Sequence, residues 1–290
     1  MKKVIFSISA MLFVGAISYA QPNVSHVNQM GLTQTATVTQ RGFDQHSDVT
    51  QRNASNVATV HQGLNPNQVN VLGFNISNDN EARVLQDGRR NTAYISQNNW
   101  SNSAIQTQMG DDNNATIWQD ETMGIFTFPL LNLGHDTAIQ TQTGKHNTAT
   151  IDQGTSGNPL PTAFASFSPV FPGAPVLPTG YNTAVQTQVG NWNLAYASQG
   201  GYMNNSVQTQ VGASYATASA RNESNHYQYG NRNTAISTQM GFKNLENVLQ
   251  IGNGNLSTGT QSTFSIFSAG NNSLVCQQGT GLISVVNQSN

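Results

Sequence analysis

The chain has 290 residues, of which only 8% are charged, and its formal net charge at pH 7 is −2. Globular domains usually carry about 25% charged residues, so this composition is not that of an ordinary globular domain, and it offers no basic surface for nucleic acid. Asn, Gln, Ser, Thr and Gly take the place of charge, which is typical of segments that stack into cross-β structure.

Residues 1–20 predict a secretory signal peptide. Two lysines precede an apolar run over residues 4–17, and the expected cleavage site lies between Ala20 and Gln21. The alternative is a membrane anchor, but an anchor needs about twenty apolar residues to span a bilayer. We therefore expect export without a retained membrane span, and a mature chain of residues 21–290.

From residue 23 onward the chain repeats an eleven-residue unit, N-x-[AS]-x-x-x-Q-x-G. One such unit holds Asn182, Ala184, Gln188 and Gly190 at these four positions. The tripeptide Gln-Thr-Gln recurs in alternate units, so the full period is a pair of units. Nineteen units have Gln in place, and one degenerate unit has Gly73 there, which makes ten pairs. A repeat this regular predicts a stacked architecture.

Insertions interrupt the repeat at about 122–134 and 155–181. The second is rich in Pro and Phe, and Pro cannot join a central strand ladder, so we expect both insertions to form loops outside the stack. The register near Arg221 to Gln228 allows two alternatives. Either Gln228 occupies the Gln position after about seven looped-out residues, or Arg221 occupies it.

The spacing within a unit predicts strands. Positions −6, −4, −2 and 0 relative to Gln have the same parity, so their side chains share one face of a strand. That face reads Asn, Ala, Val or Ile, and Gln, and is the expected inward face, while Thr, Ser, Tyr and Lys point outward. A helix is disfavoured because the apolar positions alternate and Gly or Asn recurs too often.

We therefore predict an all-β fold, a β-solenoid of about ten two-strand rungs. Rungs stacked at about 4.8 Å would make a body on the order of 45 Å long. The Gly after each Gln is expected to adopt positive φ at a corner.

Stacked Asn and Gln side chains can hydrogen-bond along the axis, which satisfies polar groups that are costly to bury. The alternative is that they are ordinary turn and surface amides. The glutamines predicted to form inward ladders are Gln29, Gln40, Gln51, Gln62, Gln86, Gln97, Gln108, Gln119, Gln142, Gln153, Gln188, Gln199, Gln210, Gln239, Gln250, Gln261, Gln277 and Gln288. The asparagines predicted to join them are Asn91, Asn102, Asn113, Asn147, Asn182, Asn193, Asn204 and Asn233.

The doubled unit N-x-A-x-x-x-Q-x-G resembles the curlin repeat of bacterial curli subunits, over nearly the whole chain outside the insertions. The resemblance implies a secreted subunit, similar to the curli major fibre subunit, that polymerises into extracellular amyloid fibres of the biofilm matrix. It further implies adhesion and cell aggregation, a nucleating partner and outer-membrane export machinery. Whether the chain would be the major subunit or the nucleator is left open.

A stacked repeat of this kind is compatible with three function classes. The repeat starts at Asn23 and continues to Gln288 with no capping segment, so both end rungs should present open strand edges to other copies, head to tail. The alternative is an adhesive or ice-binding module that uses outward threonines, but the outward residues vary between rungs. A solenoid enzyme would need clustered charged residues. We expect no enzymatic activity, no catalytic or metal site and no cofactor.

The charged residues, the histidines and the cysteine have structural interpretations. The pairs Arg89–Arg90 and Asp111–Asp112 sit at predicted corners, where they either oppose edge pairing or form ordinary solvated turns. The six histidines occur singly, without metal-ligand spacing. Cys276 is interpreted as a small strand residue rather than a reactive thiol.

Overall fold

The computed structural model describes residues 23–63, 77–119, 134–154, 180–213, 216–263 and 269–290. Within these ranges the chain forms nineteen β-strands and one short 3-10 helix, η2 (Ala218–Ala220). The predicted signal peptide, with its cleavage site, and most of both predicted insertions lie outside the described residues. None of the helices in the described ranges has the length and apolar character needed to span a membrane.

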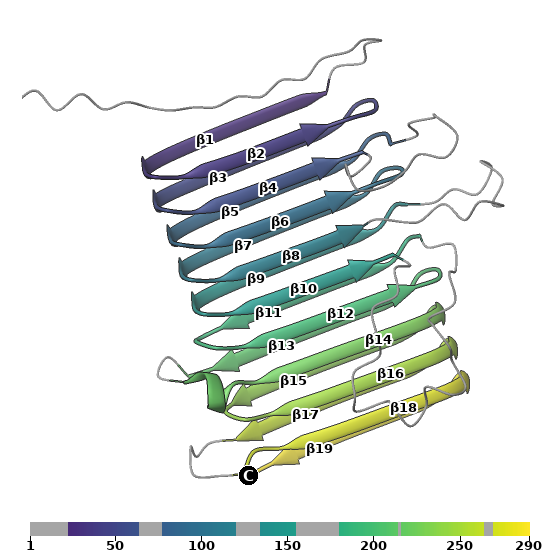
Figure 1. The fold of residues 1–290 in the computed structure, drawn as a ribbon. Helices are drawn as coiled ribbons and strands as arrows, with labels where there is room; N and C mark the ends of the chain where they lie inside the picture. The colour runs from purple at the N-terminus through teal and green to yellow at the C-terminus, as the bar shows by residue number, and fades with distance from the viewer. Residues whose placement is uncertain (1–22, 64–76, 120–133, 155–179, 214–215, 264–268) are drawn as a thin grey trace, which may run out of the picture.

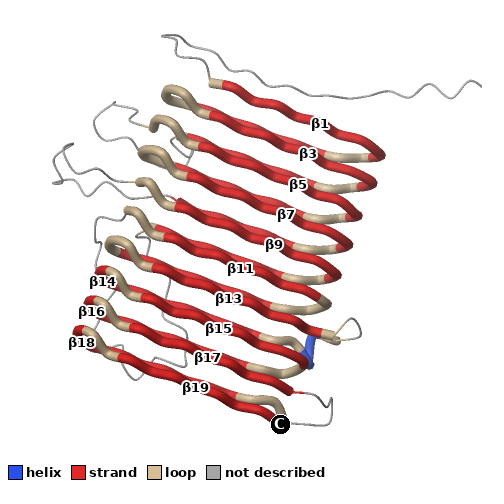
Figure 2. Tube along the Cα trace, turned by 180° about the vertical axis from the view of Figure 1, so that it is seen from behind, coloured by secondary structure: helices blue, strands red, loops and turns tan. Residues whose placement is uncertain are grey.

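The strands form two parallel sheets that lie back to back along one axis (Figure 1). The odd-numbered strands form sheet A, in chain order: β1 (Val24–Leu32), β3 (His46–Ala54), β5 (Glu81–Arg89), β7 (Ser103–Asp111), β9 (Thr137–Lys145), β11 (Thr183–Val189), β13 (Asn205–Gly212), β15 (Thr234–Gly241), β17 (Leu256–Thr263) and β19 (Ile283–Ser289). Figure 2 shows these strands from the side of sheet A.

The even-numbered strands form sheet B: β2 (Thr35–Gln40), β4 (Val57–Gln62), β6 (Thr92–Gln97), β8 (Asn114–Gln119), β10 (Thr148–Gln153), β12 (Leu194–Gly200), β14 (Glu223–Asn231), β16 (Leu245–Asn253) and β18 (Asn272–Thr280). Consecutive strands thus alternate between the sheets, and each pair of strands makes one rung. The prediction of an all-β solenoid of about ten two-strand rungs is confirmed, with ten strands in sheet A and nine in sheet B.

The eleven-residue unit sets the register. In sheet A, Gln188 pairs with Gln210, and in sheet B, Gln199 pairs with Gln228. The second pairing decides the ambiguous region: Gln228 holds the Gln position, and the alternative with Arg221 there is wrong.

The degenerate unit around Gly73 lies outside the described residues. β3 pairs directly with β5 and β4 with β6. Where the sequence predicted ten pairs, the described residues hold nine complete rungs and one further strand, β19.

The interior between the sheets is narrow and built from small and polar side chains. In β7 the burial alternates along the strand, with Ala104, Gln106 and Gln108 buried and the residues between them half-buried. Ala and Val or Ile of successive rungs form one apolar cluster, which includes Val60, Ile95 and Ile117. The inward face thus has the predicted parity.

Glycines at the corners allow adjacent rungs to approach closely. Gly88 has φ +138°, and a Cβ at this position would lie 1.8 Å from the carbonyl oxygen of Gly110 in the next rung. The expectation of positive φ at this position is confirmed. The corners also place non-glycine residues at positive φ, among them Arg90, Asp112 and His146, which the sequence pattern did not indicate.

The outer face of sheet B departs from the expected polar surface. Tyr227, Tyr229 and Leu249 are buried there, and Tyr196 and Ile251 pack against them. Their positions have outward parity, so part of this face is apolar and covered. In sheet A the pattern is closer to the expected one, in which inward residues are buried and outward residues are exposed to solvent.

Candidate functional site

The glutamines of sheet A form one continuous ladder along the axis. In each link the side-chain Nε2 of one Gln donates to Oε1 of the Gln in the next rung, over 2.7–2.9 Å. The ladder runs through Gln29, Gln51, Gln86, Gln108, Gln142, Gln188, Gln210, Gln239, Gln261 and Gln288. The structure therefore places all ten on one hydrogen-bonded column.

Sheet B carries a second ladder of the same kind, with Nε2 to Oε1 distances of 2.8–3.0 Å. It runs through Gln40, Gln62, Gln97, Gln119, Gln153, Gln199, Gln228, Gln250 and Gln277. Gln228 was not among the predicted ladder residues because its register was ambiguous, and the structure adds it.

In every ladder glutamine except Gln29, the second hydrogen of the amide ties the two sheets together. Gln97 of sheet B donates to the carbonyl of Glu81 in sheet A over 2.9 Å, and Gln108 of sheet A donates to the carbonyl of Thr92 in sheet B over 2.9 Å. A buried polar group without a partner costs about 1–3 kcal/mol. The amides avoid this cost and fix the distance between the sheets as well.

The predicted asparagines line the two corners in separate columns. Asn91, Asn113, Asn147 and Asn193 lie where the chain passes from sheet A to sheet B, and Asn102, Asn182, Asn204 and Asn233 lie at the opposite corner. Asn113 is typical: its backbone N–H donates to Oδ1 of Asn91 over 3.1 Å, and its Nδ2 donates to the carbonyl of Gly144 over 2.9 Å. Asp136 occupies the same position between Asn102 and Asn182.

A third glutamine column lies inside sheet A, and sequence reasoning missed it. Gln106 donates to Gln140, Gln140 to Gln186, and Gln186 to Gln208, over 2.7–2.9 Å. These are the first glutamines of the Gln-Thr-Gln tripeptides, two residues before the predicted ladder positions. The same parity already marked them as inward, so the tripeptide was the signal that could have found them.

The column ends at a buried polar cluster in the later rungs. His226 lies between the hydroxyls of Ser206, 2.8 Å from Nδ1, and Ser237, 2.5 Å from Nε2. A neutral imidazole donates from one nitrogen and accepts at the other, so it satisfies both contacts. Burial lowers the pKa of His226 to about 3, which keeps the ring neutral.

Glu246 of β16 is also fully buried in this region. It occupies a position that holds Ala or Ser in other units, and the space comes from Gly259 in the facing sheet, where a Cβ would lie 1.9 Å from the Glu246 carboxylate. Neither carboxylate oxygen has a hydrogen-bond partner among the described residues. Burial raises the pKa of Glu246 to about 7.

The predicted corner charges pair with each other across rungs. Arg90 makes two hydrogen bonds to Asp112, of 2.6 and 2.7 Å, while Asp111 contacts both Arg89 and Lys145 at 3.2 Å. The Arg89 and Lys145 contacts lower the pKa of Asp111 to about 2. These residues lie on β5, β7 and β9 and their corners, away from both ends of the stack. They therefore do not oppose pairing at the edges of the end strands.

The outward residues of sheet A are more regular than the sequence suggested. One column is threonine on six successive strands: Thr107, Thr141, Thr187, Thr209, Thr238 and Thr260. We call the outward side chains of β7 to β19, from the start of each strand to the residue after the ladder Gln, the threonine face. None of these side chains is charged. The expectation that outward residues vary between rungs is wrong for this face.

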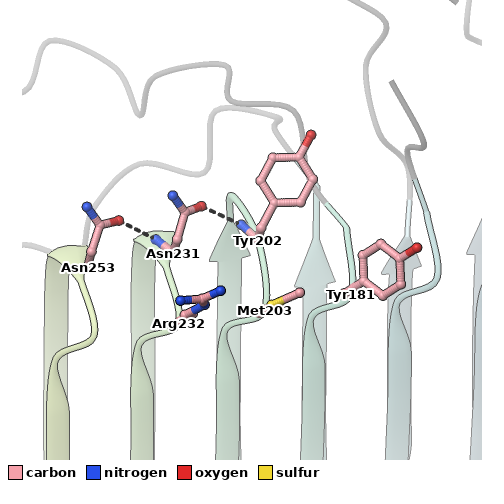
Figure 3. Close-up of a pocket in the computed structure, with 6 residues that line it drawn as sticks. All are labelled: Tyr181, Tyr202, Met203, Asn231, Arg232 and Asn253. Carbon is pink, nitrogen blue, oxygen red and sulfur yellow. Dashed lines mark hydrogen bonds between the residues drawn. The ribbon is translucent and has the colours of Figure 1, made fainter. Parts of the chain in front are cut away.

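A shallow groove at one corner is lined by Tyr181, Tyr202, Met203, Asn231, Arg232 and Asn253, with a volume of about 420 Å³ (Figure 3). Within it, the backbone N–H of Asn231 donates to Asn253 and that of Tyr202 donates to Asn231, over 3.1 and 3.0 Å. Its polar groups thus serve the corner itself. Nowhere in the described ranges do three or more His, Cys, Asp or Glu side chains gather as a metal site would require.

The feature best suited to a function is the pair of ladders at the two ends of the stack. The end strands β1, β2, β18 and β19 each have one strand neighbour among the described residues. Gln277 and Gln288 each donate one amide hydrogen to a backbone carbonyl within the chain, which leaves the second hydrogen of each amide. No described residue donates to Oε1 of Gln29 or Gln40. The end of the stack at β18 and β19 therefore presents amide donors, and the end at β1 and β2 presents amide acceptors.

Comparison with known protein families matches residues 78–105 to the curlin associated repeat. The matched segment contains β5, β6, the start of β7 and the corners before and between these strands, so it spans slightly more than one rung. A comparison with curated proteins finds no significant match. The segment is similar to a curlin repeat. The other rungs carry Gln at the same position, and most units have Asn and Gly at theirs.

Proposed function

We propose that the protein is a secreted structural subunit that self-assembles into extracellular, curli-like amyloid fibres. On this proposal the fibres are pilus-like, lie at the surface of a bacterium and serve the biofilm matrix in adhesion and cell aggregation. The match to the curlin associated repeat and the parallel stacking of every rung support the proposal. A curlin-type solenoid is a structural fold, and the protein needs no catalytic activity or cofactor for this role.

The observation that carries the proposal is the complementarity of the two ends. Every ladder link donates from the strand nearer the N-terminus to the strand nearer the C-terminus. The amide of Gln288 can therefore donate to Gln29 of a second copy. Sheet B has one strand fewer than sheet A, so in a copy added on β19 the residues Gln277 and Gln40 stand about two strand spacings apart and do not meet. Contact between two like ends would oppose donor to donor or acceptor to acceptor. Head-to-tail addition continues the ladder of sheet A and pairs the open edges of β19 and β1.

The partners on this proposal are, first, other copies of the chain. The resemblance to curli subunits adds a nucleating subunit and outer-membrane export machinery, while neither nucleic acid nor a membrane span is required.

The test is to incubate purified protein comprising residues 21–290 and to follow thioflavin fluorescence, then to record fibre diffraction. The proposal expects fibres with reflections near 4.8 Å and about 10 Å. Protein that remains folded and monomeric for days at micromolar concentration would refute it.

A variant of the acceptor end makes the test specific. Gln29→Lys with Gln40→Lys replaces both terminal acceptors by donors and should slow seeded elongation at least tenfold. Thr50→Lys with Leu85→Lys adds the same charge at outward positions of β3 and β5 and should leave elongation within twofold of wild type. Equal elongation rates for the two variants would contradict growth through these ends.

A monomeric adhesive or ice-binding module is the second candidate. The regular threonine column of sheet A favours it, because a binding module of this type needs a repeated outward surface. Thermal hysteresis produced by the folded monomer would support this candidate, and its absence together with fibre growth would exclude it.

A further inference from the structure

We propose that the threonine face binds the same face of a second copy, so that stacks of this protein associate side by side through sheet A. This inference rests on the proposed function, because it concerns how fibres built from these stacks pair laterally. The face itself is a property of a single molecule.

The threonine face is a long, flat surface without charge. The outer surface of sheet A is charged at its N-terminal part, where His26, Asp48 and Arg83 lie in one column on β1, β3 and β5. From β7 to β19 no outward side chain of the threonine face carries a charge. Charged side chains are the usual device that prevents sheet surfaces and edges from associating, and the threonine face lacks them, because Asp111 and Lys145 lie at the ends of β7 and β9, beyond its limits.

The threonine face also exposes apolar area. Beside the threonines runs a column of Ile105, Ile139, Val185, Val207 and Ile236. Val285 and Ile283 of β19 are 64% and 72% exposed. Large exposed apolar patches mark interaction sites, and parallel sheets usually have both faces covered. In sheet A only the inner face is covered by the described residues.

The threonine face is large enough to form a stable interface. Seven strands at about 4.8 Å and about seven residues at about 3.3 Å give a face of roughly 30 Å by 23 Å. Two such faces in contact bury on the order of 1,300 Å², which lies within the range of about 1,200–2,000 Å² found for stable protein interfaces. The area is thus sufficient for a specific pair.

The composition of the face indicates that its partner is a second copy of this chain. Dry interfaces between paired sheets are built from uncharged columns of residues such as Thr, Val and Ile. A second copy has the same spacing between its rungs, so the contact repeats over the full length of the face. Two sheets in such contact lie about 10 Å apart, and neither face brings a charge that would be left unpaired.

The experiment compares two charge variants that differ only in where the charge lies. Thr141→Lys with Thr209→Lys puts two lysines on the threonine face. The matched control, Thr50→Lys with Leu85→Lys, puts two lysines in the same column of sheet A but on the charged strands β3 and β5. The readouts are thioflavin growth rate, which reports stacking, and fibre mass per unit length, which reports lateral pairing.

We expect both variants to grow fibres at the wild-type rate, within twofold. The mass per unit length of the Thr141→Lys, Thr209→Lys fibre should fall to half the wild-type value, while the control keeps the wild-type value. An unchanged mass per unit length in the face variant would overturn the inference.

Failure of the proposed function is distinguishable from failure of this inference. If wild-type protein forms no fibres, sedimentation of the soluble protein tests whether two copies pair through the threonine face. A dimer that the face variant converts to monomer supports it, and a monomeric wild type at high micromolar concentration refutes it. Thermal hysteresis that the face variant abolishes would assign the face to ice and would also refute the pairing.

Discussion

Glu246 should make the stability of this protein depend on pH. The side chain is fully buried in β16 and its carboxylate oxygens have no hydrogen-bond partner among the described residues. Burial disfavours the charged form, which raises the pKa from 4.5 to about 7. The folded protein therefore holds this proton more tightly than the unfolded chain does.

The sign and size of the effect follow from that difference. The contribution to stability is fully present below the unfolded-state pKa of 4.5 and is lost as the pH rises through about 7. A shift from 4.5 to about 7 corresponds to about 3 kcal/mol in the free energy of unfolding. His226 acts in the opposite direction, because its pKa is lowered from 6.5 to about 3 in the folded protein. Below pH 6.5 the unfolded chain binds a proton at His226 that the folded protein does not, so this group lowers stability as the pH falls. The contribution of Glu246 is therefore measured as a difference between wild type and a variant that lacks the carboxylate.

The assay is guanidinium unfolding of freshly purified monomer, followed by tryptophan fluorescence at about pH 4 and about pH 8. Because Glu246 and His226 act in opposite directions, the quantity to compare is the pH dependence of the variant and of wild type. From about pH 4 to about pH 8, the free energy of unfolding of Glu246→Gln should rise by about 3 kcal/mol relative to that of wild type. Glu223→Gln, which removes a half-buried carboxylate from β14, should show the wild-type pH dependence. A Glu246→Gln variant that keeps the wild-type pH dependence would refute the reasoning.

Three further changes test the ladders, the corners and the ion pairs. Gln119→Ala should lower the free energy of unfolding by about 3 kcal/mol, since it orphans several buried groups; Gln288→Ala, at the open end, should cost about 1 kcal/mol yet slow seeded growth more than Gln119→Ala does. Gly88→Ala should cost more than about 3 kcal/mol in thermal unfolding because its Cβ would meet a backbone oxygen, whereas Gly254→Ala, with open space around it, should cost about 1 kcal/mol. Asp111→Asn should cost less than about 1 kcal/mol, and the cost should vanish in about 1 M salt, because its ion pairs are at the surface; an effect that persists in salt would contradict that assignment.

Periodicity predicts the strands and their parity, because a single step of eleven residues fixes strand length, corner and register together. Each Gln at the ladder position therefore meets the Gln of the next rung. Periodicity left two registers open near Arg221, and the structure decides for Gln228. Arg221 at a buried ladder position would leave a charge unpaired.

Compensating substitutions could not be predicted, because they depend on which residues face each other across the interior. Glu246 fits only because Gly259 stands opposite it in sheet A, and the two belong to different strands with no sequence signal that links them. The buried tyrosine cluster on sheet B was missed for a related reason. Outward parity predicts exposure only where nothing covers the sheet.

The scarcity of charge in this chain follows from the stacking itself. Each outward position meets its counterpart about 4.8 Å away in the next rung, and two like charges at that distance repel by about 1 kcal/mol in water and by about 3 kcal/mol at an effective dielectric constant of 20. Charges recur in register here with opposite signs, as in the column of Arg89, Asp111 and Lys145. A stack therefore excludes most charge from its repeated positions. The same exclusion leaves the threonine face without the side chains that would keep a second copy away.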